Sequence, residues 1–300
     1  MRSIALSLPL MLAACVAPSD APVPPAPRAA PAPPVQPPTP AAAQRPEGAR
    51  DFVLIGDARQ GGVMRGTVPA GTRALSFDGA SVAVDGNGQF LIAFDRDSQQ
   101  TAILRAELSD GTVVTRSLSV APGDWHLEYI NAPYTGRATS AEFRRLRDGE
   151  LAQIAQARAI NAQSDGWRQN FRWPVSGPIS SGFGSQRVYQ GKPGSYHGGV
   201  DIRAKTGTPF VAPADGVVVL AAERPFTLEG YLLIVDHGMG LNSAFLHCSS
   251  LAVNQGDVVR QGQVLGTVGS SGRATGPHMH WGMKWRDARL DPVALAGPMP

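Results

Sequence analysis

Cysteine is nearly absent from this 300-residue chain, which holds only Cys15 and Cys248. Because Cys15 lies in a segment with the features of an export signal, the mature globular part would keep a single thiol. That part therefore offers no partner for an internal disulfide. A chain of this length can bury one large core or two modest cores without such cross-links.

Long apolar runs and a strong net charge are missing as well. Beyond the first residues, no stretch of the sequence approaches the ~20 consecutive apolar residues of a membrane-spanning helix. The net charge of +3 is spread along the chain, and no run of Lys and Arg is interleaved with aromatic residues. Nucleic acid is therefore not expected as a partner. The mild basic excess suits an anionic polymer such as cell wall, although it singles out no partner by itself.

Residues 1–15 have the pattern of a lipoprotein signal peptide. Arg2 precedes an apolar stretch over residues 4–12, and small residues lead into Cys15. The segment resembles the lipobox of bacterial lipoproteins, in which the cysteine is lipidated and becomes the new N-terminus. An ordinary signal peptide with a chance cysteine is the alternative. Val16, in place of Asp, resembles lipoproteins of the diderm outer membrane, so we expect a lipid anchor on Cys15 that holds the exported protein there, facing the periplasm.

Proline and alanine dominate residues 16–50, as in Pro31-Ala32-Pro33-Pro34. Such a composition cannot form a packed core, and its prolines favour extended polyproline II. We expect a semi-rigid tether, with a ligand for a proline-binding module as the alternative.

Short alternating apolar runs fill residues 51–122, for example Phe90–Phe94, with turn signals such as Asp78-Gly79 and Asp110-Gly111 between them. About six strands in ~70 residues predict a small antiparallel β-sandwich of immunoglobulin-like type. This domain has no catalytic constellation. His126, just beyond it, is alone and is expected to be a surface or boundary residue.

A connecting helix is predicted within residues 136–165. Thr139-Ser140-Ala141-Glu142 fits a capping box at its start. An approximate apolar face is expected from Phe143, Leu146, Leu151, Ile154 and Ile160.

The segment 171–293 is again β-like and contains five of the six histidines. In His197-Gly198-Gly199-Val200-Asp201 the paired glycines disfavour a helix, so a loop leading into a strand is expected. His278-Met279-His280 would place both imidazoles on one side of a strand. His247 follows an apolar run between these two groups.

These residues predict a zinc site. Catalytic zinc is held by three protein ligands, often imidazole and carboxylate, with the fourth position left for water. His197, Asp201 and one member of the His278/His280 pair form such a set, and the remaining histidines would be catalytic or supporting groups.

Residues 172–292 resemble the lysostaphin-type, or LytM-like, zinc metallopeptidases of peptidoglycan, which implies an antiparallel β-sheet peptidase domain. The resemblance covers about two-fifths of the chain. It is carried by Trp173–Gly177, Ile179–Gly184, His197–Asp201, Gly207–Val218, Val235–Gly238, Phe245–His247 and Gly269–His280.

The resemblance also implies roles for individual residues. One zinc ion would be held by His197, Asp201 and His280, and His247 and His278 would be the catalytic pair. Which of these two is the general base stays open. Phe245 and Cys248 depart from the Tyr and Leu that the family often has there. Cys248 is expected to be a small buried thiol, and His237 a structural residue of a turn.

The expected function is a zinc-dependent endopeptidase that hydrolyses cross-links or stem peptides of bacterial peptidoglycan. The alternative is a catalytically silent, wall-binding lipoprotein that activates a partner amidase. All five positions of the implied site are filled, which favours the enzyme. No motif in the sequence identifies a cell-division or wall-synthesis protein as a partner.

Overall fold

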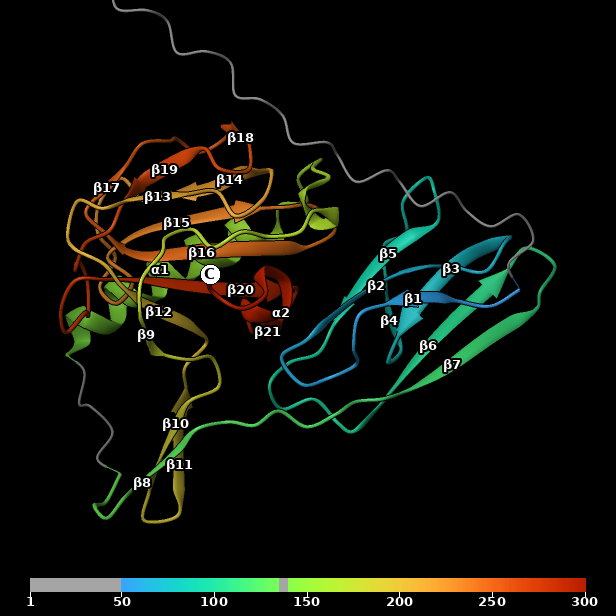
Figure 1. Cartoon of the computed structure of the whole chain (residues 1–300), viewed down its shortest axis with the longest axis horizontal. Coiled ribbons are helices and arrows are strands. Elements are labelled where there is room, and N and C mark those ends of the chain that lie inside the picture. Colours follow the sequence, from blue (N-terminus) through green and yellow to red (C-terminus); the bar gives the residue numbers. More distant parts are fainter. Residues whose placement is uncertain (1–49, 135–139) are drawn as a thin grey trace, which may run out of the picture. The chain divides into compact units, whose positions relative to one another are not determined.

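A computed structural model describes residues 50–134 and 140–300 of the protein (Figure 1). The predicted signal peptide with Cys15 and the Pro/Ala-rich tether fall almost entirely outside these described residues. No helix in the described part is both long and apolar enough to cross a membrane. The described chain is mainly β, as the sequence predicts, and most of its strand pairs are antiparallel.

The first described domain is a sandwich of two antiparallel sheets, with strand orders β1-β2-β5 and β4-β3-β6-β7. Its strands are β1 (Val53–Ile55), β2 (Val63–Thr67), β3 (Thr72–Phe77), β4 (Ala80–Ser81), β5 (Gln89–Ala93), β6 (Thr101–Leu108) and β7 (Val113–Ser119). Buried and exposed residues alternate along β6, which is typical of a strand with one face on a core. The rings of Phe77 and Phe94 meet edge to face in that core, with their centroids 5.6 Å apart.

The second domain is built on one large sheet, with strand order β18-β14-β15-β16-β20-β12-β9 and β21 paired to β20. These strands are β9 (Ile179–Ser181), β12 (Gly199–Arg203), β14 (Gly216–Ala221), β15 (Tyr231–Asp236), β16 (Leu241–Cys248), β18 (Val258–Val259), β20 (His278–Trp285) and β21 (Ala288–Leu290). A smaller sheet, β13-β19-β17, comprises β13 (Pro209–Val211), β17 (Ser250–Leu251) and β19 (Val264–Thr267). The central strand β15 is covered on both faces, which explains its continuous apolar run.

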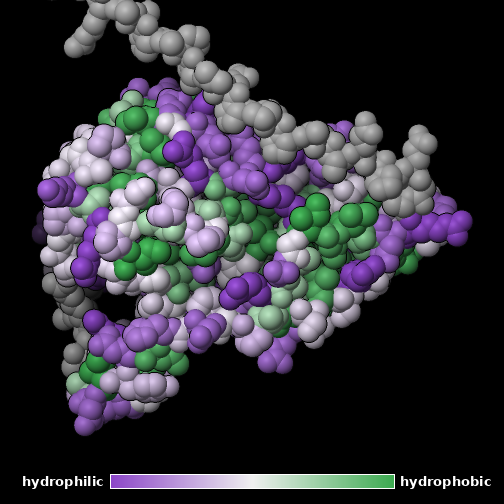
Figure 2. All heavy atoms as spheres, viewed as in Figure 1, coloured by the Kyte–Doolittle hydropathy of each residue, from purple (hydrophilic) through white to green (hydrophobic). Residues whose placement is uncertain are grey.

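A third sheet joins the segment between the two domains to the peptidase part. β8 (Leu127–Ile130) pairs with β10 (Gln186–Tyr189), which in turn pairs with β11 (Lys192–Tyr196). The β8–β10 pair is parallel, whereas the sequence predicts only antiparallel pairing and assigns no strand to residues 127–130. Figure 2 shows polar residues interspersed with apolar ones over this sheet, at the lower left of the view.

The helix α1 (Ala141–Ala159) is shorter than the predicted segment, and it is followed by a 3₁₀ turn at Gly166–Arg168. Ser140 is the N-cap, and its Oγ accepts a hydrogen bond of 3.0 Å from the backbone N–H of Phe143. Thr139, with which the predicted capping box begins, lies outside the described residues. The cap that the structure shows is Ser140, and the residue three positions after it is a phenylalanine, not the glutamate of a capping box. A second short helix, α2 (Val293–Ala296), closes the domain.

The predicted apolar face of this helix is wrong in part. Leu146, Leu151 and Ile160 are each more than 40% exposed. The face that packs on the sheet presents Glu150, Ile154 and Ala157, and it lies on an apolar cluster formed by Val219, Leu220, Ala222, Phe226, Leu232, Ile234 and Ala244.

A polar network makes this inward face possible. Arg147 donates to Glu150 and, with two bonds of 2.6 and 2.7 Å, to Glu229. Glu150 also accepts from the backbone N–H and the hydroxyl of Thr227. Because Glu229 and Thr227 lie some 80 positions further along the chain, helical periodicity could not reveal this face.

Candidate metal centre

The strand register brings the predicted ligands together. Asp201 on β12 pairs directly with His280 on the neighbouring strand β20. His197 lies in the connection just before β12, as the paired glycines predict. Side chains alternate along β20, so His278 and His280 project from the same face of the sheet.

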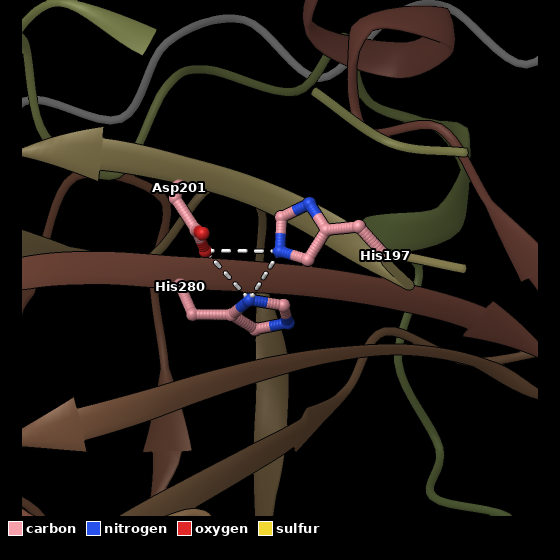
Figure 3. Close-up of side chains that lie close together, drawn as sticks. All are labelled: His197, Asp201 and His280. Atoms are coloured by element: carbon pink, nitrogen blue, oxygen red, sulfur yellow. Dashed lines mark hydrogen bonds and ion pairs between the residues drawn. The ribbon is translucent and has the colours of Figure 1, made fainter. Parts of the chain in front are cut away.

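Three ligand atoms converge on one point in Figure 3. His197 Nε2 lies 3.0 Å from Asp201 Oδ1 and 3.0 Å from His280 Nδ1. His280 Nδ1 lies 2.8 Å from the same carboxylate oxygen. All three side chains are half-buried or more, so little water competes for this point.

This donor set fits a zinc ion. Two imidazole nitrogens and a carboxylate oxygen are good zinc ligands, and three of them leave one position of a tetrahedron open. Ligand atoms ~2.0–2.1 Å from a tetrahedral metal lie roughly 3.3 Å from one another. The observed separations of 2.8–3.0 Å are close to that value. When all three atoms present lone pairs to one another at such distances, a shared cation relieves their repulsion.

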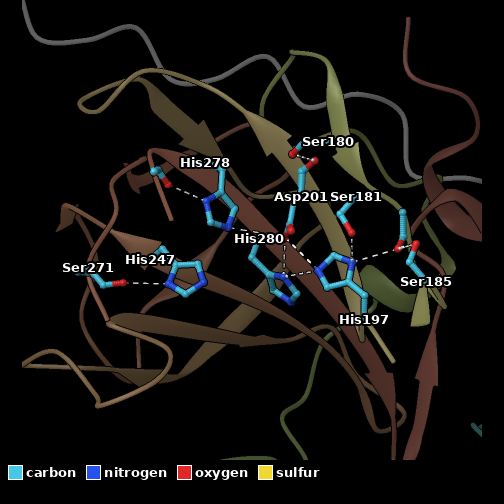
Figure 4. A network of polar contacts seen from close by, with 11 residues as sticks. Ser180, Ser181, Ser185, His197, Asp201, His247, Ser271, His278 and His280 are labelled. Carbon is cyan, nitrogen blue, oxygen red and sulfur yellow. Dashed lines mark hydrogen bonds and ion pairs between the residues drawn. The ribbon is translucent and has the colours of Figure 1, made fainter. Parts of the chain in front are cut away.

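Further contacts orient these ligands (Figure 4). His197 Nδ1 lies 3.0 Å from the carbonyl oxygen of Gly182 and 3.2 Å from Ser181 Oγ. An Nδ1–H that donates to this carbonyl leaves Nε2 free to bind a metal. No motif in the sequence identifies Gly182 and Ser181 as supporting residues, although both lie in the segment 179–184 that carries the family resemblance.

Electrostatics favour the ionised carboxylate of Asp201. Burial alone would raise its pKa, but hydrogen bonds and charge interactions with His197 and His280 together hold the pKa well below its usual range. Burial lowers the pKa of His280, in spite of its contact with Asp201. A carboxylate beside a neutral imidazole is the protonation state that metal binding requires.

His247 and His278 lie beside the three ligands, with their own ring centroids 4.9 Å apart. His247 Nδ1 contacts the carbonyl oxygen of Ser271 at 2.8 Å, and His278 Nδ1 contacts that of Gly276 at 2.8 Å. Each contact fixes a tautomer whose Nε2 is available toward the site. His278 Nε2 lies 3.7 Å from Asp201 Oδ1, so this ring borders the ligand cluster.

The backbone of His247 has an unusual conformation that the sequence does not signal. Its φ is +62°, in the left-handed region that non-glycine residues rarely adopt. Its N–H donates a 2.8 Å hydrogen bond to the carbonyl oxygen of Glu229, which holds the strained residue in place. Strain of this kind is found preferentially at functional sites.

The structure does not bring the other singled-out residues to this centre. His237 is fully buried within the turn after β15. His126 is exposed at the start of β8. Cys248 is buried in the core, and burial raises the pKa of its thiol to about 12, so it is an inert packing residue.

Three hollows border the candidate centre. The largest, of about 1030 Å³, is lined by His197 and His126 among others. Another, of about 560 Å³, is lined by Asp201, His278 and Lys205 among others. The third, a groove of about 470 Å³, is lined by His247, His280 and Arg158 of α1 among others. A ligand cluster open on both sides suits an extended chain that passes over it.

Comparison with known proteins agrees with this geometry. Peptidase family M23 matches residues 195–292, which contain all five converging side chains. This part of the chain is an M23 peptidase domain. The match confirms the lysostaphin-type resemblance seen in the sequence.

The M23 domain has similar sequences in several bacteria. Cell division protein DipM of Caulobacter vibrioides is 37% identical over 128 residues, which are 43% of this chain and 20% of that protein. Peptidoglycan DD-endopeptidase ShyB of Vibrio cholerae is 30% identical over 230 residues, which are 71% of this chain and 53% of that protein. The chain thus spans between a fifth and about half of the length of these curated relatives.

A solved structure extends the similarity beyond the M23 domain. A crystal structure from Pseudomonas aeruginosa, assigned to the M23 peptidases, is 27% identical with a TM-score of 0.62. It covers 81% of this chain, and 96% of its own length is matched. Because the M23 match itself covers only residues 195–292, the shared fold includes parts upstream of it.

Proposed function

We propose that the protein is a zinc-dependent endopeptidase that hydrolyses peptide bonds in bacterial peptidoglycan. The observation that carries this proposal is the convergence of five side chains, three as a ligand set and two as histidines beside it. The match to peptidase family M23 supports the reaction class.

In this proposal His197, Asp201 and His280 hold one zinc ion per chain. When bound, zinc supplies a Lewis acid for the scissile carbonyl and lowers the pKa of a water to about 7. The proton transfers are carried out by side chains of the protein. His247 and His278 accept and donate the protons of the reaction and stabilise negative charge on the substrate.

The environment of His247 suits a proton acceptor. Burial is the main cause that lowers the pKa of His247, and the charges of His278 and His280 add to it. A neutral His247 can accept a proton at neutral pH, as a general base must.

The bond cut is proposed by analogy. ShyB is named a peptidoglycan DD-endopeptidase, and cleavage of a D-alanyl–diaminopimelate cross-link is the corresponding reaction for this chain. We propose further that the protein is exported and lipidated on Cys15, at the outer membrane. The Pro/Ala-rich residues 16–50 would then give the peptidase its reach toward the wall.

The alternative function is activation of a partner amidase by a wall-binding protein that has no catalytic activity of its own. The complete set of five side chains argues against it, because a silent member would not need all of them.

The test is digestion of purified sacculi with the protein from Glu47 onward, loaded with zinc. Mass spectrometry of the products should show new amines and carboxyls at one type of peptide bond. The Asp201→Ala variant is the matched inactive control. Zinc-free protein that releases no muropeptide, yet stimulates an amidase, would favour the alternative function.

A further inference from the structure

Three cations gather in the groove that leads away from the candidate metal centre. Arg158, Lys284 and Arg289 all line this groove, and Arg273 lines it as well. Glu229 is the single carboxylate among the lining residues, and two short bonds tie it to Arg147. The groove is therefore strongly cationic at the end far from the ligand cluster.

The sheet surface at the bottom of the groove, between the metal centre and these cations, has only small residues at its centre. Lys284 lies on the same face of β20 as His280, four residues further along, which is about 13 Å between Cα atoms. Gly282 lies between them and is flanked in register by Gly199 and Ala244. A Cβ on Gly199 would lie 2.9 Å from His280 Nε2, so a larger residue would crowd this floor. An extended peptide can lie along it.

The cations come from different elements and face one another. Arg158 projects from α1, and its Nη1 lies 3.3 Å from Asn242 Oδ1. Asn242 pairs in register with Lys284 across β16 and β20. Burial, and then the charge of Arg289, lower the pKa of Arg158 to about 10. Burial, and then the charge of Arg158, lower the pKa of Lys284.

No acid neutralises this cluster at close range. Among residues 50–134 and 140–300, none forms an ion pair with Arg158, Lys284 or Arg289 within 4.0 Å. Asp95 accepts hydrogen bonds from the Arg289 backbone N–H and the Tyr196 hydroxyl. Asp287, and more weakly Asp95, attract Lys284 only from beyond ion-pair distance. Arg158 and Lys284 are half-buried, and Arg289 is exposed beside them. Half-buried cations without a close counter-ion are costly, which makes the cluster a ready receptor for an anion.

We propose that Arg158, Lys284 and Arg289 form a carboxylate subsite, which selects peptide substrates with a free carboxylate near the scissile bond. The inference rests on the proposed endopeptidase function. The guanidinium fork and the ammonium can both hold a carboxylate by charge-assisted hydrogen bonds. In a cross-linked stem peptide the carboxylates nearest the scissile bond are those of the diamino acid and of the C-terminal residue.

Three soluble cross-linked muropeptides test this subsite. One is unmodified, one is amidated on the diamino acid carboxylate, and one is amidated at the C-terminus. The zinc-loaded native protein should cleave the unmodified peptide with a kcat/KM about 10- to 100-fold above that of one amidated peptide. Which amide is slow identifies the source of the carboxylate. Equal rates for all three peptides would overturn the proposal.

Variants then assign the selectivity to the cluster. The selectivity is the kcat/KM for the unmodified peptide divided by that for the slower amidated peptide. In the double variant Arg158→Met, Lys284→Met this ratio should fall toward one. The Lys284→Arg variant should keep most of the selectivity. Arg224→Met, which removes a surface arginine outside the groove, is the matched charge control. A ratio unchanged in the double variant would refute the assignment. Thermal unfolding of each variant separates these outcomes from misfolding.

Binding separates this proposal from the endopeptidase function. Calorimetric titration of the metal-free protein with the same three muropeptides reads the subsite without turnover. Suppose that the zinc-loaded protein hydrolyses none of the peptides, but that one amidated peptide binds more weakly than the unmodified one and that this difference disappears in the double variant. The carboxylate subsite is then supported, and the endopeptidase proposal fails. Equal affinities of the native protein for all three peptides would refute the carboxylate subsite, whether or not the protein hydrolyses them.

Discussion

The buried imidazole of His237 should make the protein lose stability in mild acid, independently of any metal. His237 is completely buried, with Nδ1 2.8 Å from the Asp215 carbonyl oxygen and Nε2 2.8 Å from Ser243 Oγ. Ser243 Oγ also accepts from Trp281 Nε1 at 3.2 Å. A neutral ring that donates from Nδ1 and accepts at Nε2 satisfies these partners, whereas a second ring N–H would face the Ser243 hydroxyl.

The sign and size of the effect follow from the pKa. Burial lowers the pKa of His237 from 6.5 to about 4. The folded state therefore binds fewer protons than the unfolded state between these values, and stability falls as pH drops below 6.5. At pH 4 the loss relative to pH 7 is about 3 kcal/mol, from 1.36 kcal/mol per pKa unit. This is a large part of the stability of an ordinary domain.

Urea unfolding of metal-free protein at pH 7 and pH 4 measures this loss. His237→Gln is the comparison, because glutamine can donate to the same carbonyl but does not titrate. The variant should be less stable at pH 7, and the gap to the native protein should narrow by about 3 kcal/mol at pH 4. Buried Asp236, whose pKa is raised by burial, titrates in both proteins and cancels in the difference. A gap of equal size at both pH values would refute the reasoning.

Four further outcomes are expected. Asp201→Ala should lower zinc occupancy, measured by elemental analysis, and abolish hydrolysis; full occupancy would remove it from the ligand set. His247→Ala should keep zinc but lose at least ~100-fold in kcat, a usual scale for a proton-transfer group, and unchanged kcat would exclude that role. Hydrolysis should decline below about pH 6, because protons compete with zinc for imidazole; a flat rate down to pH 4 in excess zinc would contradict a histidine-based site. Deleting most of residues 21–43 should spare hydrolysis of soluble muropeptides but impair wall cleavage in cells, unless the shortened, lipidated protein complements a deletion strain fully.

The candidate site was predictable because its chemistry is local in the sequence. HxxxD at the start of a strand and HxH on a strand each place two residues of the site close together by backbone geometry alone. The register of β12 against β20, which joins Asp201 to His280, could not be read from either motif. The family resemblance supplied that pairing, and it also separated His280 from His278.

The parts that escaped prediction depend on contacts between distant segments. The inward face of α1 is set by Glu150 and its partners Thr227 and Glu229, not by the apolar spacing of the helix. The cationic groove likewise needs Arg158 from the helix beside Lys284 from β20. The left-handed φ of His247 has no sequence signal at all, because the residue is neither glycine nor asparagine.

The parallel pairing of β8 with β10 has a practical consequence for any shortened form of the protein. A fragment that starts at residue 171, where the sequence alone places the peptidase boundary, lacks residues 127–130. In that fragment, residues 186–189 of β10 would lose their partner strand β8, and the backbone N–H and C=O groups on that edge would be unpaired. Such an open strand edge recruits strands from other molecules. We expect that fragment to self-associate, whereas one that begins ahead of β8 should remain monodisperse at the same concentration.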